Sequence, residues 1–380
     1  MASTDLLAIL PCLPVPLDSG LKLRLHNNLR ALGTLGRYRR IHVLALGSAQ
    51  PRCEKLPAIG DWEAFGDDHS ALQAAVQRYY TRSFGIALTL LEDPALYPLV
   101  EAVAGVSSGA IVVDMHNIES ELALSISQAY PIWRWRRRDD IRRTAARYRA
   151  IEDRVLRSPA HIWVCSELDK HTLETRHPGR DRISVVPNII WDRPEALPPF
   201  SPERLTKALY AGTYAYYPNR QAAKFICEKL APRLEHVPGM QLTLVGSGPK
   251  RFMQRAARRH QMLEVTGRVP DMTPYLEACG IQLMPIFRGG GTRLKAIEAS
   301  LRGLIIVGTA KPVEGLDFQP GTHYLHAESA SQFNDGIQRL VGDTLLAETI
   351  RHSAFQKTRG AFTHMSLMRV LSNRLRIFDI

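Results

Sequence analysis

Short apolar runs recur along the chain, each followed by a stretch with helical periodicity. They cover residues 6–10, 41–46, 86–91, 110–114, 161–165 and 183–186, and then 208–211, 242–245, 263–266, 281–284 and 304–307. Near-continuous apolar runs are typical of parallel strands, because helices bury both faces of a parallel sheet. The sequence therefore predicts an α/β fold with two series of parallel strands.

A proline-rich segment, residues 191–202, separates the two series. Proline interrupts the hydrogen bonding of helices and strands, so we expect this segment to be a linker. We predict two α/β domains, residues 1–196 and 197–361, each long enough to bury its own core. Ligands of parallel sheets bind beyond the carboxyl ends of the strands, where glycine and polar residues follow several of the runs.

The composition limits the classes of protein to which this chain can belong. None of the 380 residues lies in an uninterrupted apolar stretch of the roughly 18 to 20 residues that a membrane-spanning helix needs. No basic segment precedes residues 6–10, so we expect no secretory signal and a cytoplasmic protein. The five cysteines lack C-x-x-C spacing, which argues against a zinc site or a disulfide framework. The net charge of +12 favours anionic partners such as nucleotides, membranes or nucleic acid.

The segment RGGGTRLKAIEA, from Arg288 to Ala299, joins three glycines to the start of a predicted helix. Glycines let the backbone approach a ligand closely, and the first turn of a helix offers unpaired N–H groups and a positive dipole end. Arg293 and Lys295 add positive charge, and Glu298 could accept hydrogen bonds from sugar hydroxyls. The segment predicts a site for a phosphorylated ligand; the alternative is a surface turn before an ordinary amphipathic helix.

Other phosphate-binding motifs are missing from the sequence. The segment LVGSGPKR has Arg251 where a dinucleotide fingerprint needs its third glycine, and no P-loop occurs. There is also no D-x-D pair to hold a divalent metal on a pyrophosphate. We therefore expect Arg, Lys and backbone amides to neutralise a bound pyrophosphate, with no metal and no cofactor.

Six landmarks occur in the order found in one enzyme family. They are PCLPVPLDSG (residues 11–20), VVDMHNIES (112–120), HIWVCSELD with VVPN (161–169 and 185–188), ALYAGTYAYYPN (208–219), GRVPDMTPYL (267–276) and GGGTRLKAIEA (289–299). Together they resemble the retaining glycosyltransferases of GT-B fold and family-4 type, the glycosyl transferases group 1. The resemblance implies two Rossmann-like domains whose parallel sheets face each other across a cleft. A last segment, residues 362–380, would cross back to the first domain as a helix.

The resemblance places donor binding in the second domain and acceptor binding mainly in the first. Donor binding is expected of Gly20, Gly212, Thr213, Arg268, Val269, Gly290, Gly291, Thr292, Arg293, Lys295 and Glu298. Glu298 matches the second glutamate of the family's E-x7-E motif and would hold the ribose hydroxyls, whereas Gly290 replaces the first. Arg220 is the only cation near Gly212, so we expect Arg293 and Lys295 to be the catalytic cations. They would stabilise the charge that grows on the leaving pyrophosphate.

His116 follows a predicted strand and matches the family's histidine-bearing loop. The resemblance implies that it is catalytic and that it binds the acceptor, with Asn117 and Glu119 positioning the same substrate. The alternative is a structural histidine followed by an asparagine that caps a turn or helix.

Residues 133–157 contain ten arginines and four acidic residues. Ile141, Ala145, Tyr148, Ile151 and Val155 lie at helical spacing, so the segment predicts an amphipathic basic helix. Its basic face is either simply solvated or docks on an anionic membrane with Trp133 and Trp135 at the interface. Nucleic-acid binding is a weaker hypothesis, because no known nucleic-acid module accompanies the arginines.

We therefore predict a glycosyltransferase of the hexosyltransferase type (EC 2.4) that moves a sugar from a nucleoside-diphosphate sugar to an acceptor hydroxyl. The acceptor is expected to be a glycan, a lipid-linked sugar or a small molecule, and the protein to be cytoplasmic, with peripheral binding to the inner face of the cell membrane as an option. Two other hypotheses stay open: a sugar-nucleotide epimerase or hydrolase of the same fold, and a non-catalytic nucleotide- or membrane-binding protein.

Overall fold

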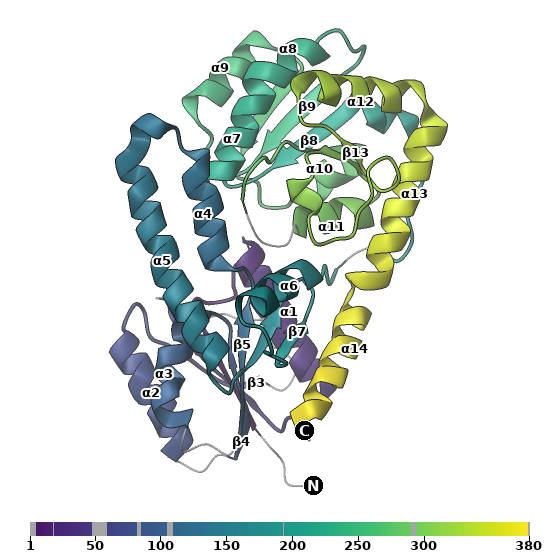
Figure 1. Cartoon of the computed structure of the whole chain (residues 1–380). Coiled ribbons are helices and arrows are strands. Elements are labelled where there is room, and N and C mark those ends of the chain that lie inside the picture. The colour runs from purple at the N-terminus through teal and green to yellow at the C-terminus, as the bar shows by residue number, and fades with distance from the viewer. Residues whose placement is uncertain are drawn as a thin grey trace. The chain divides into compact units, whose positions relative to one another are not determined.

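The computed structural model describes residues 5–17, 19–47, 59–81, 85–104, 109–192, 194–289 and 294–378. The chain divides into two compact units, whose elements are labelled in Figure 1. The first unit takes residues 1–122, 142–191 and 362–380, and the second takes residues 123–141 and 192–361. The second unit therefore includes a segment from the chain's first half.

The first unit contains a sheet of seven parallel strands in the order β3-β2-β1-β4-β5-β6-β7. The strands are β1 (Asp5–Leu10), β2 (Ile41–Ala45), β3 (Ile59–Ala64), β4 (Ile86–Leu91), β5 (Ala110–Met115), β6 (His161–Val164) and β7 (Ile183–Val185). Side chains of β1 alternate between two cores: Leu7 and Ile9 enter one, and Leu6 and Leu10 enter the other. Burial on both faces explains why this strand is apolar throughout.

Helices cover both faces of this sheet. The helices α2 (His69–Thr81), α3 (Tyr97–Ala104) and the end of α5 (Trp135–Arg157) bury side chains in one core. The other core contains α1 (Gly20–Leu35) and α14 (His364–Leu375), which pack against each other. Leu367 and Leu371 of α14 are fully buried, one helical turn apart. The unit also contains α4 (Glu119–Ala129) and α6 (Glu167–Arg176), of which α4 continues into the second unit.

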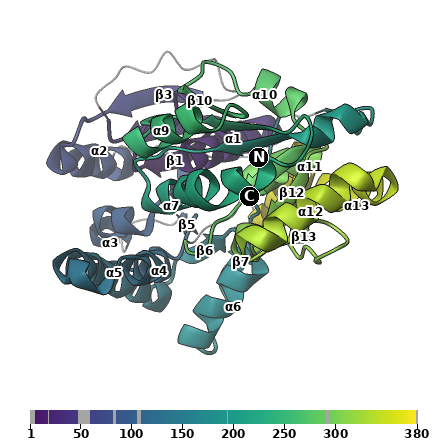
Figure 2. The same ribbon diagram turned by 90° about the horizontal axis from the view of Figure 1, so that it is seen from above.

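The second unit contains a sheet of six parallel strands in the order β10-β9-β8-β11-β12-β13. The strands are β8 (Lys207–Ala211), β9 (Gln241–Val245), β10 (Leu263–Gly267), β11 (Ile281–Met284), β12 (Ile305–Gly308) and β13 (Leu325–His326). The helices are α7 (Tyr217–Phe225), α8 (Ala231–Leu234), α9 (Arg251–Arg259), α10 (Thr273–Ala278), α11 (Leu294–Leu301), α12 (Ala330–Gly342) and α13 (Thr344–Ala361). The helices α12 and α13 contact each other, and both are labelled in Figure 2.

All eleven predicted strands are present, so the two series of parallel strands are confirmed. Two strands were not predicted from the sequence, β3 and β13, and each lies at the edge of its sheet. The described residues between β7 and the 3₁₀ helix Pro202–Thr206 form no helix and no strand of either sheet.

Candidate functional site

Two glycines bring the ends of neighbouring strands of the second unit very close together. Gly212 follows β8, and Gly246 follows β9 with a φ of +144°. A Cβ on Gly246 would lie 1.8 Å from the carbonyl oxygen of Gly212, which no side chain can tolerate. A Cβ on Gly212 would lie 2.9 Å from the side chain of Asn219. Both amides are paired within the unit: Gly212 donates to the Val245 carbonyl at 2.9 Å, and Gly246 donates to the Gly267 carbonyl at 2.8 Å. The two glycines therefore permit close backbone packing at this carboxyl edge, where parallel sheets bind ligands.

Lys295 lies beside this edge, in the first turn of α11. Its Nζ lies 3.3 Å from Oδ1 of Asn219 and 5.6 Å from the ring centre of Tyr210. The Tyr210 hydroxyl donates to the same Oδ1 at 3.1 Å, and the Asn219 amide donates to the Thr213 carbonyl at 3.1 Å. These contacts bring Lys295, Gly212 and Thr213, which the sequence assigned to donor binding, to one place.

No sequence pattern predicted Asn219 and Tyr210, which hold Lys295 there. Arg220 was the only cation expected near Gly212 from the sequence, but its guanidinium lies 5.2 Å from the ring centre of Tyr217. The one available signal was the YPN sequence that follows the strand and starts α7. An asparagine buried among apolar residues needs hydrogen-bond partners, which makes it a candidate site residue.

Glu298 lies one turn after Lys295, so the two side chains share one face of α11. About a third of its side chain is exposed (32%), and Oε1 lies 3.5 Å from Nε of Arg302. Burial raises the pKa of Glu298, while Arg302 and Lys295 oppose this shift. The carboxylate is thus open enough to accept hydrogen bonds from a ligand's hydroxyl groups.

The loop after β10 joins the same carboxyl edge. The Gly246 amide donates to the carbonyl of Gly267 at 2.8 Å, and Gly267 has a φ of +80°. Arg268 follows as an exposed residue and Val269 as a half-buried one. The structure therefore places the predicted donor-binding residues Arg268 and Val269 directly after the Gly267 carbonyl that pairs with Gly246.

The glycine run is only partly described. Gly290, Gly291, Thr292 and Arg293 lie outside the described residues, whereas Arg288 and Gly289 lie within them. The Gly289 amide donates to Oγ of Ser125 at 3.1 Å, and the Arg288 guanidinium donates to Oε1 of Gln128 at 2.9 Å. Ser125 and Gln128 are one turn apart on α4, so one face of this helix holds Arg288 and the first glycine of the run.

The predicted acceptor residues lie in the first unit, directly after β5. Nε2 of His116 lies 3.5 Å from Oε1 of Glu119, which also accepts a hydrogen bond from the Asn117 amide at 2.9 Å. Burial lowers the pKa of His116, but Glu119, Asp93 and Asp114 outweigh it and leave the pKa raised. Nδ1 of His116 is buried and has no hydrogen-bond partner among the described residues. The three predicted residues thus form one hydrogen-bonded group with an unused ring nitrogen.

A buried charged network lies next to this group, and no sequence pattern predicted it. The Arg24 guanidinium donates to both carboxylate oxygens of Asp114, at 2.6 and 2.5 Å, and to Oδ1 of Asn188 at 2.9 Å. Glu92, which directly follows β4, accepts from Asn28 at 3.2 Å. Burial and the nearby Asp114 raise the pKa of Glu92 well above its ordinary value. The network fixes the carboxyl ends of β4 and β5, from which the His116 loop begins.

Gly20, the remaining donor residue predicted in the first unit, is the exposed first residue of α1. Its neighbour Ser19 caps the helix by accepting the Lys22 amide at 3.3 Å. Gly20 therefore presents unpaired backbone at a helix start.

The predicted basic helix begins at Trp135, after a 3₁₀ turn at Ile132–Arg134. Ala145 and Val155 of its apolar stripe are buried. Ile132 is 77% exposed, Trp133 80% and Trp135 58%. The connection between α4 and α5 therefore carries large apolar side chains that its own unit does not cover.

No helix among the described residues is long and apolar enough to cross a membrane. The described His, Cys, Asp and Glu side chains form no group of three or more arranged to hold a metal ion.

Comparisons with known proteins agree with the motifs. Residues 206–343 match the family model described as Glycosyl transferases group 1. The predicted family is confirmed for this segment, and with it the class of enzyme, a glycosyltransferase. A search of the curated proteins gives no match.

Solved structures show the fold of the whole chain. Sucrose-phosphate synthase from Thermosynechococcus elongatus is 16% identical, with a TM-score of 0.74 and 98% coverage of both chains. Anabaena HepE, solved with UDP and glucose, is 12% identical, with a TM-score of 0.68 over 98% of this chain and 99% of that one. A glycosyltransferase from Rickettsia africae is 12% identical, with a TM-score of 0.68 over 100% of this chain and 98% of that one. The predicted GT-B fold is confirmed.

Proposed function

We propose that this chain, whose residues 206–343 form a domain of the glycosyl transferases group 1 family, moves a sugar from a nucleoside-diphosphate sugar to an acceptor hydroxyl. The observation that carries the proposal is the position of Lys295. Its ammonium group lies against Asn219 at the carboxyl edge of the sheet, close to Gly212 and Thr213. A cation fixed at the carboxyl edge of a parallel sheet is suited to binding a pyrophosphate.

The chemistry follows from the leaving group. When the glycosidic bond breaks, negative charge grows on the pyrophosphate, and groups already aimed at that charge lower the barrier. Lys295 supplies a full positive charge at this place. Tyr210 and Asn219 fix the Lys295 side chain before substrate arrives, which reduces the reorganisation that the reaction requires. Arg293 and the amides of Gly290 and Gly291 complete the proposed phosphate site.

We assign nucleoside binding to two elements beside the proposed phosphate site, α11 and the loop after β10. Glu298, on the same face of α11 as Lys295, would accept hydrogen bonds from the ribose hydroxyls, and Arg268 with Val269 would lie along the base. Uridine diphosphate is the first nucleotide to test, because the similar HepE protein was solved with UDP.

His116 is the proposed acceptor-side group. Its Nδ1 has no partner among the described residues, while Glu119 holds the other ring nitrogen. A buried imidazole fixed at one nitrogen can present the other to a substrate hydroxyl. Asn117 and Glu119 would fix the ring orientation and contact the acceptor.

Retention at the anomeric carbon and independence of metal are part of the proposal. They rest on the family resemblance and on the cations that take a metal's place at the phosphate. Retention is tested by NMR, which compares the anomeric configuration of the product with that of the donor. Metal independence is tested by activity after exhaustive chelation with EDTA.

The function is tested with a panel of nucleoside diphosphates and their sugars. A ligand that binds only the folded state raises the melting temperature, so at least one nucleotide should do so. Lys295→Met should reduce donor turnover by about 100-fold, in the range seen when a group that stabilises developing charge is lost. Lys224→Met, which removes an exposed lysine of α7, is the matched control. If no nucleotide in the panel changes the melting temperature, the proposal is wrong.

The same panel separates the other two hypotheses. An epimerase or hydrolase would convert the nucleotide sugar with no acceptor present, at a rate comparable to any transfer. A non-catalytic binding protein would be stabilised by nucleotide but would show no turnover that depends on Lys295.

We also propose that the connection between α4 and α5 docks on the inner face of an anionic membrane. Trp133 and Trp135 are exposed apolar side chains, Arg134, Arg136 and Arg137 between and after them are exposed, and residues 122–138 include no acidic residue. Tryptophan and arginine are suited to the interface of such a membrane. A lipid-linked acceptor would fit this location.

Vesicle sedimentation tests the docking proposal. Replacing Trp133 and Trp135 with alanine should abolish binding to vesicles that contain phosphatidylserine, and wild-type protein should not bind pure phosphatidylcholine. The matched control neutralises three exposed arginines of α9, Arg255, Arg258 and Arg259. Equal binding by the tryptophan variant and the wild type would exclude this docking surface.

A further inference from the structure

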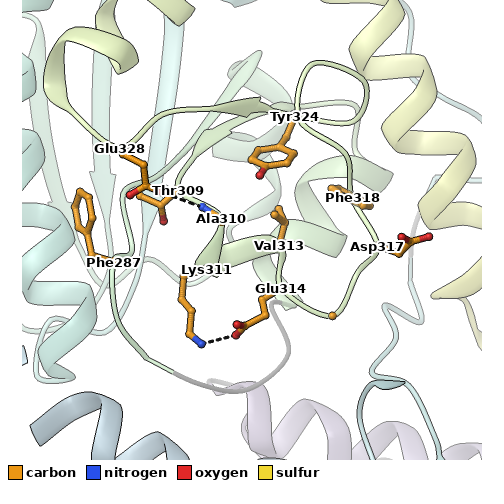
Figure 3. A pocket seen from close by; sticks show the side chains of 11 residues that line it. Phe287, Thr309, Ala310, Lys311, Val313, Glu314, Asp317, Phe318, Tyr324 and Glu328 are labelled. Atoms are coloured by element: carbon orange, nitrogen blue, oxygen red, sulfur yellow. Dashed lines mark hydrogen bonds and ion pairs between the residues drawn. The ribbon is translucent and has the colours of Figure 1, made fainter. Parts of the chain in front are cut away.

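A cavity of about 450 Å³ lies within the second unit, beside the carboxyl ends of β11 and β12 (Figure 3). Its lining comes from Phe287 and from the segment that follows β12: Thr309, Ala310, Lys311, Val313, Glu314, Gly315, Asp317, Phe318, Tyr324 and Glu328. None of the donor or acceptor residues predicted from the sequence lines it. Its position at the carboxyl edge is the place where parallel sheets bind ligands.

The charges of the lining argue against a phosphate ligand. The cavity has three carboxylates, Glu314, Asp317 and Glu328, and one ammonium group, Lys311. Lys311 pairs with Glu314, and Asp317 pairs with Lys357. No positive charge remains in excess, so an anion would gain little there.

The same pairs favour an uncharged ligand with many hydroxyl groups. A carboxylate that is already balanced by a lysine keeps lone pairs for hydrogen bonds, and a neutral hydroxyl can use them without a further charge. Oε1 of Glu328 accepts a long bond from the Ala310 amide at 3.4 Å and lies 3.4 Å from Nε2 of His326, and half of the Glu328 side chain is exposed. The hydroxyl groups of a sugar match these acceptors.

Aromatic rings supply the apolar part of the lining. Phe287 is 43% exposed although it packs edge-on against Phe225, so part of its ring is open to a ligand. Phe318 and Tyr324 border the cavity on the side of the segment after β12, as Figure 3 shows. An open aromatic ring offers apolar contact to the C–H groups of a pyranose, which many small-molecule sites combine with a few polar groups.

We propose that this cavity is a sugar subsite that binds a neutral pyranose ring through Glu314, Glu328 and Phe287. The assignment rests on the proposed function. The carboxylates of the cavity lie close along the chain to the glycine run, in which Gly290 replaces a glutamate of the family's motif. Phe287 leads directly into that run. The ring belongs either to the donor or to the acceptor, and the experiment distinguishes the two.

Two variants test the subsite, Glu314→Gln and Phe287→Ala, with Glu348→Gln, which alters an exposed glutamate of α13, as the matched control. If the subsite binds the donor sugar, both variants should weaken the binding of UDP-glucose, or of the matching nucleotide sugar, by about tenfold or more in calorimetry. Their affinity for the free nucleoside diphosphate should stay within about twofold, because the phosphate site is unchanged. If it binds the acceptor, donor affinity stays unchanged and the KM for the acceptor rises instead.

A direct measurement keeps the subsite separate from the enzymatic proposal. Saturation-transfer NMR with glucose and methyl glucosides should show contact in the wild type and a loss of contact in Phe287→Ala. Melting curves of both variants check that they fold. Wild-type contact with sugars but no response to any nucleotide would refute the proposed function and leave the subsite standing. The subsite proposal would be overturned if sugar contact, donor affinity and acceptor KM were unchanged in both variants. It would also be overturned if the wild type contacted tetramethylammonium, a cation, but no sugar.

Discussion

The hydroxyl of Ser125 accepts a hydrogen bond of 3.1 Å from the amide of Gly289, two residues that lie far apart in the chain but in the same unit. Ser125 belongs to α4, which starts at Glu119 beside His116 and ends in the second unit. The same end of α4 is fixed by Tyr217, whose hydroxyl donates to the Ala129 carbonyl at 3.0 Å. The helix that follows the His116 loop in the chain thus also holds the first residue of the glycine run.

Ser125→Ala should weaken donor use more than it weakens folding. Gly289 is buried, so its amide would lose its partner, at a cost of about 1 kcal/mol or slightly more. We expect the KM for the donor to rise several-fold, because the start of the glycine run is no longer held. Ser125→Thr, which keeps a hydroxyl group, should leave the KM for the donor near its wild-type value.

Ser127→Ala is the control for this helix. Ser127 is buried two residues further along α4, and its hydroxyl donates to the Leu124 carbonyl within the same helix. The two variants should differ in donor KM, and equal KM values would refute the positioning role of Ser125.

Gly246→Ala should strongly destabilise the second unit. Its Cβ would lie 1.8 Å from a carbonyl oxygen, in a backbone conformation with φ of +144°. We expect a loss of more than about 3 kcal/mol in the free energy of unfolding, from steric overlap and backbone strain together. Gly248→Ala is the matched control, because its φ is +68° but its nearest neighbouring atom is 3.9 Å away. Strain alone should cost it about 1 kcal/mol in chemical denaturation.

The stability of the first unit should fall as the pH rises above the ordinary pKa of a glutamate side chain. Burial and Asp114 raise the pKa of Glu92 well above its ordinary value, so the folded state binds more protons than the unfolded state between the two pKa values. Within that window the free energy of unfolding should decrease by up to about 1.4 kcal/mol per pH unit. Glu92→Gln should remove this dependence, and the exposed Glu277→Gln should keep it. Parallel pH profiles for all three proteins would contradict the assignment.

Glu119→Gln should lower the pKa of His116. Burial alone lowers this pKa, and Glu119 makes the largest contribution that raises it. The pKa of His116 is higher in the folded state than in the unfolded state. The stability that protonated His116 contributes is therefore complete when the pH is below the unfolded-state pKa, and it is lost as the pH rises through the folded-state pKa. NMR titration of the imidazole should show the pKa falling in Glu119→Gln but not in Glu121→Gln, which alters an exposed glutamate of the same helix. Identical titration curves would show that a group other than Glu119 raises the pKa of His116.

Most of the fold could be predicted from the sequence because buried parallel strands are apolar along their whole length. The strand β3 was missed since its sequence, IGDWEA, includes two acidic residues, which an edge strand tolerates on its exposed side. The strand β13 has two residues, too few for any pattern.

The candidate site was predictable only where one short segment holds several functional residues. His116, Asn117 and Glu119 lie within four positions, and the structure joins them by hydrogen bonds or close contacts. The partnership of Lys295 with Asn219 depends on how α7 and α11 pack, which no local spacing encodes. The cavity beside Phe287 is defined by a long irregular segment, and such segments have no periodicity from which their shape can be inferred.

The packing of α14 against α1 has a consequence for the order of folding during synthesis. Leu367, Leu371 and Leu375 complete the core that contains Leu25 and Leu29, and Ser372 accepts a hydrogen bond from Arg37 at 3.0 Å. The ribosome makes the second unit's main segment, residues 192–361, before it makes α14. The unit whose synthesis starts first is therefore the last to finish folding, and until α14 emerges the apolar face of α1 must be shielded from aggregation by other means.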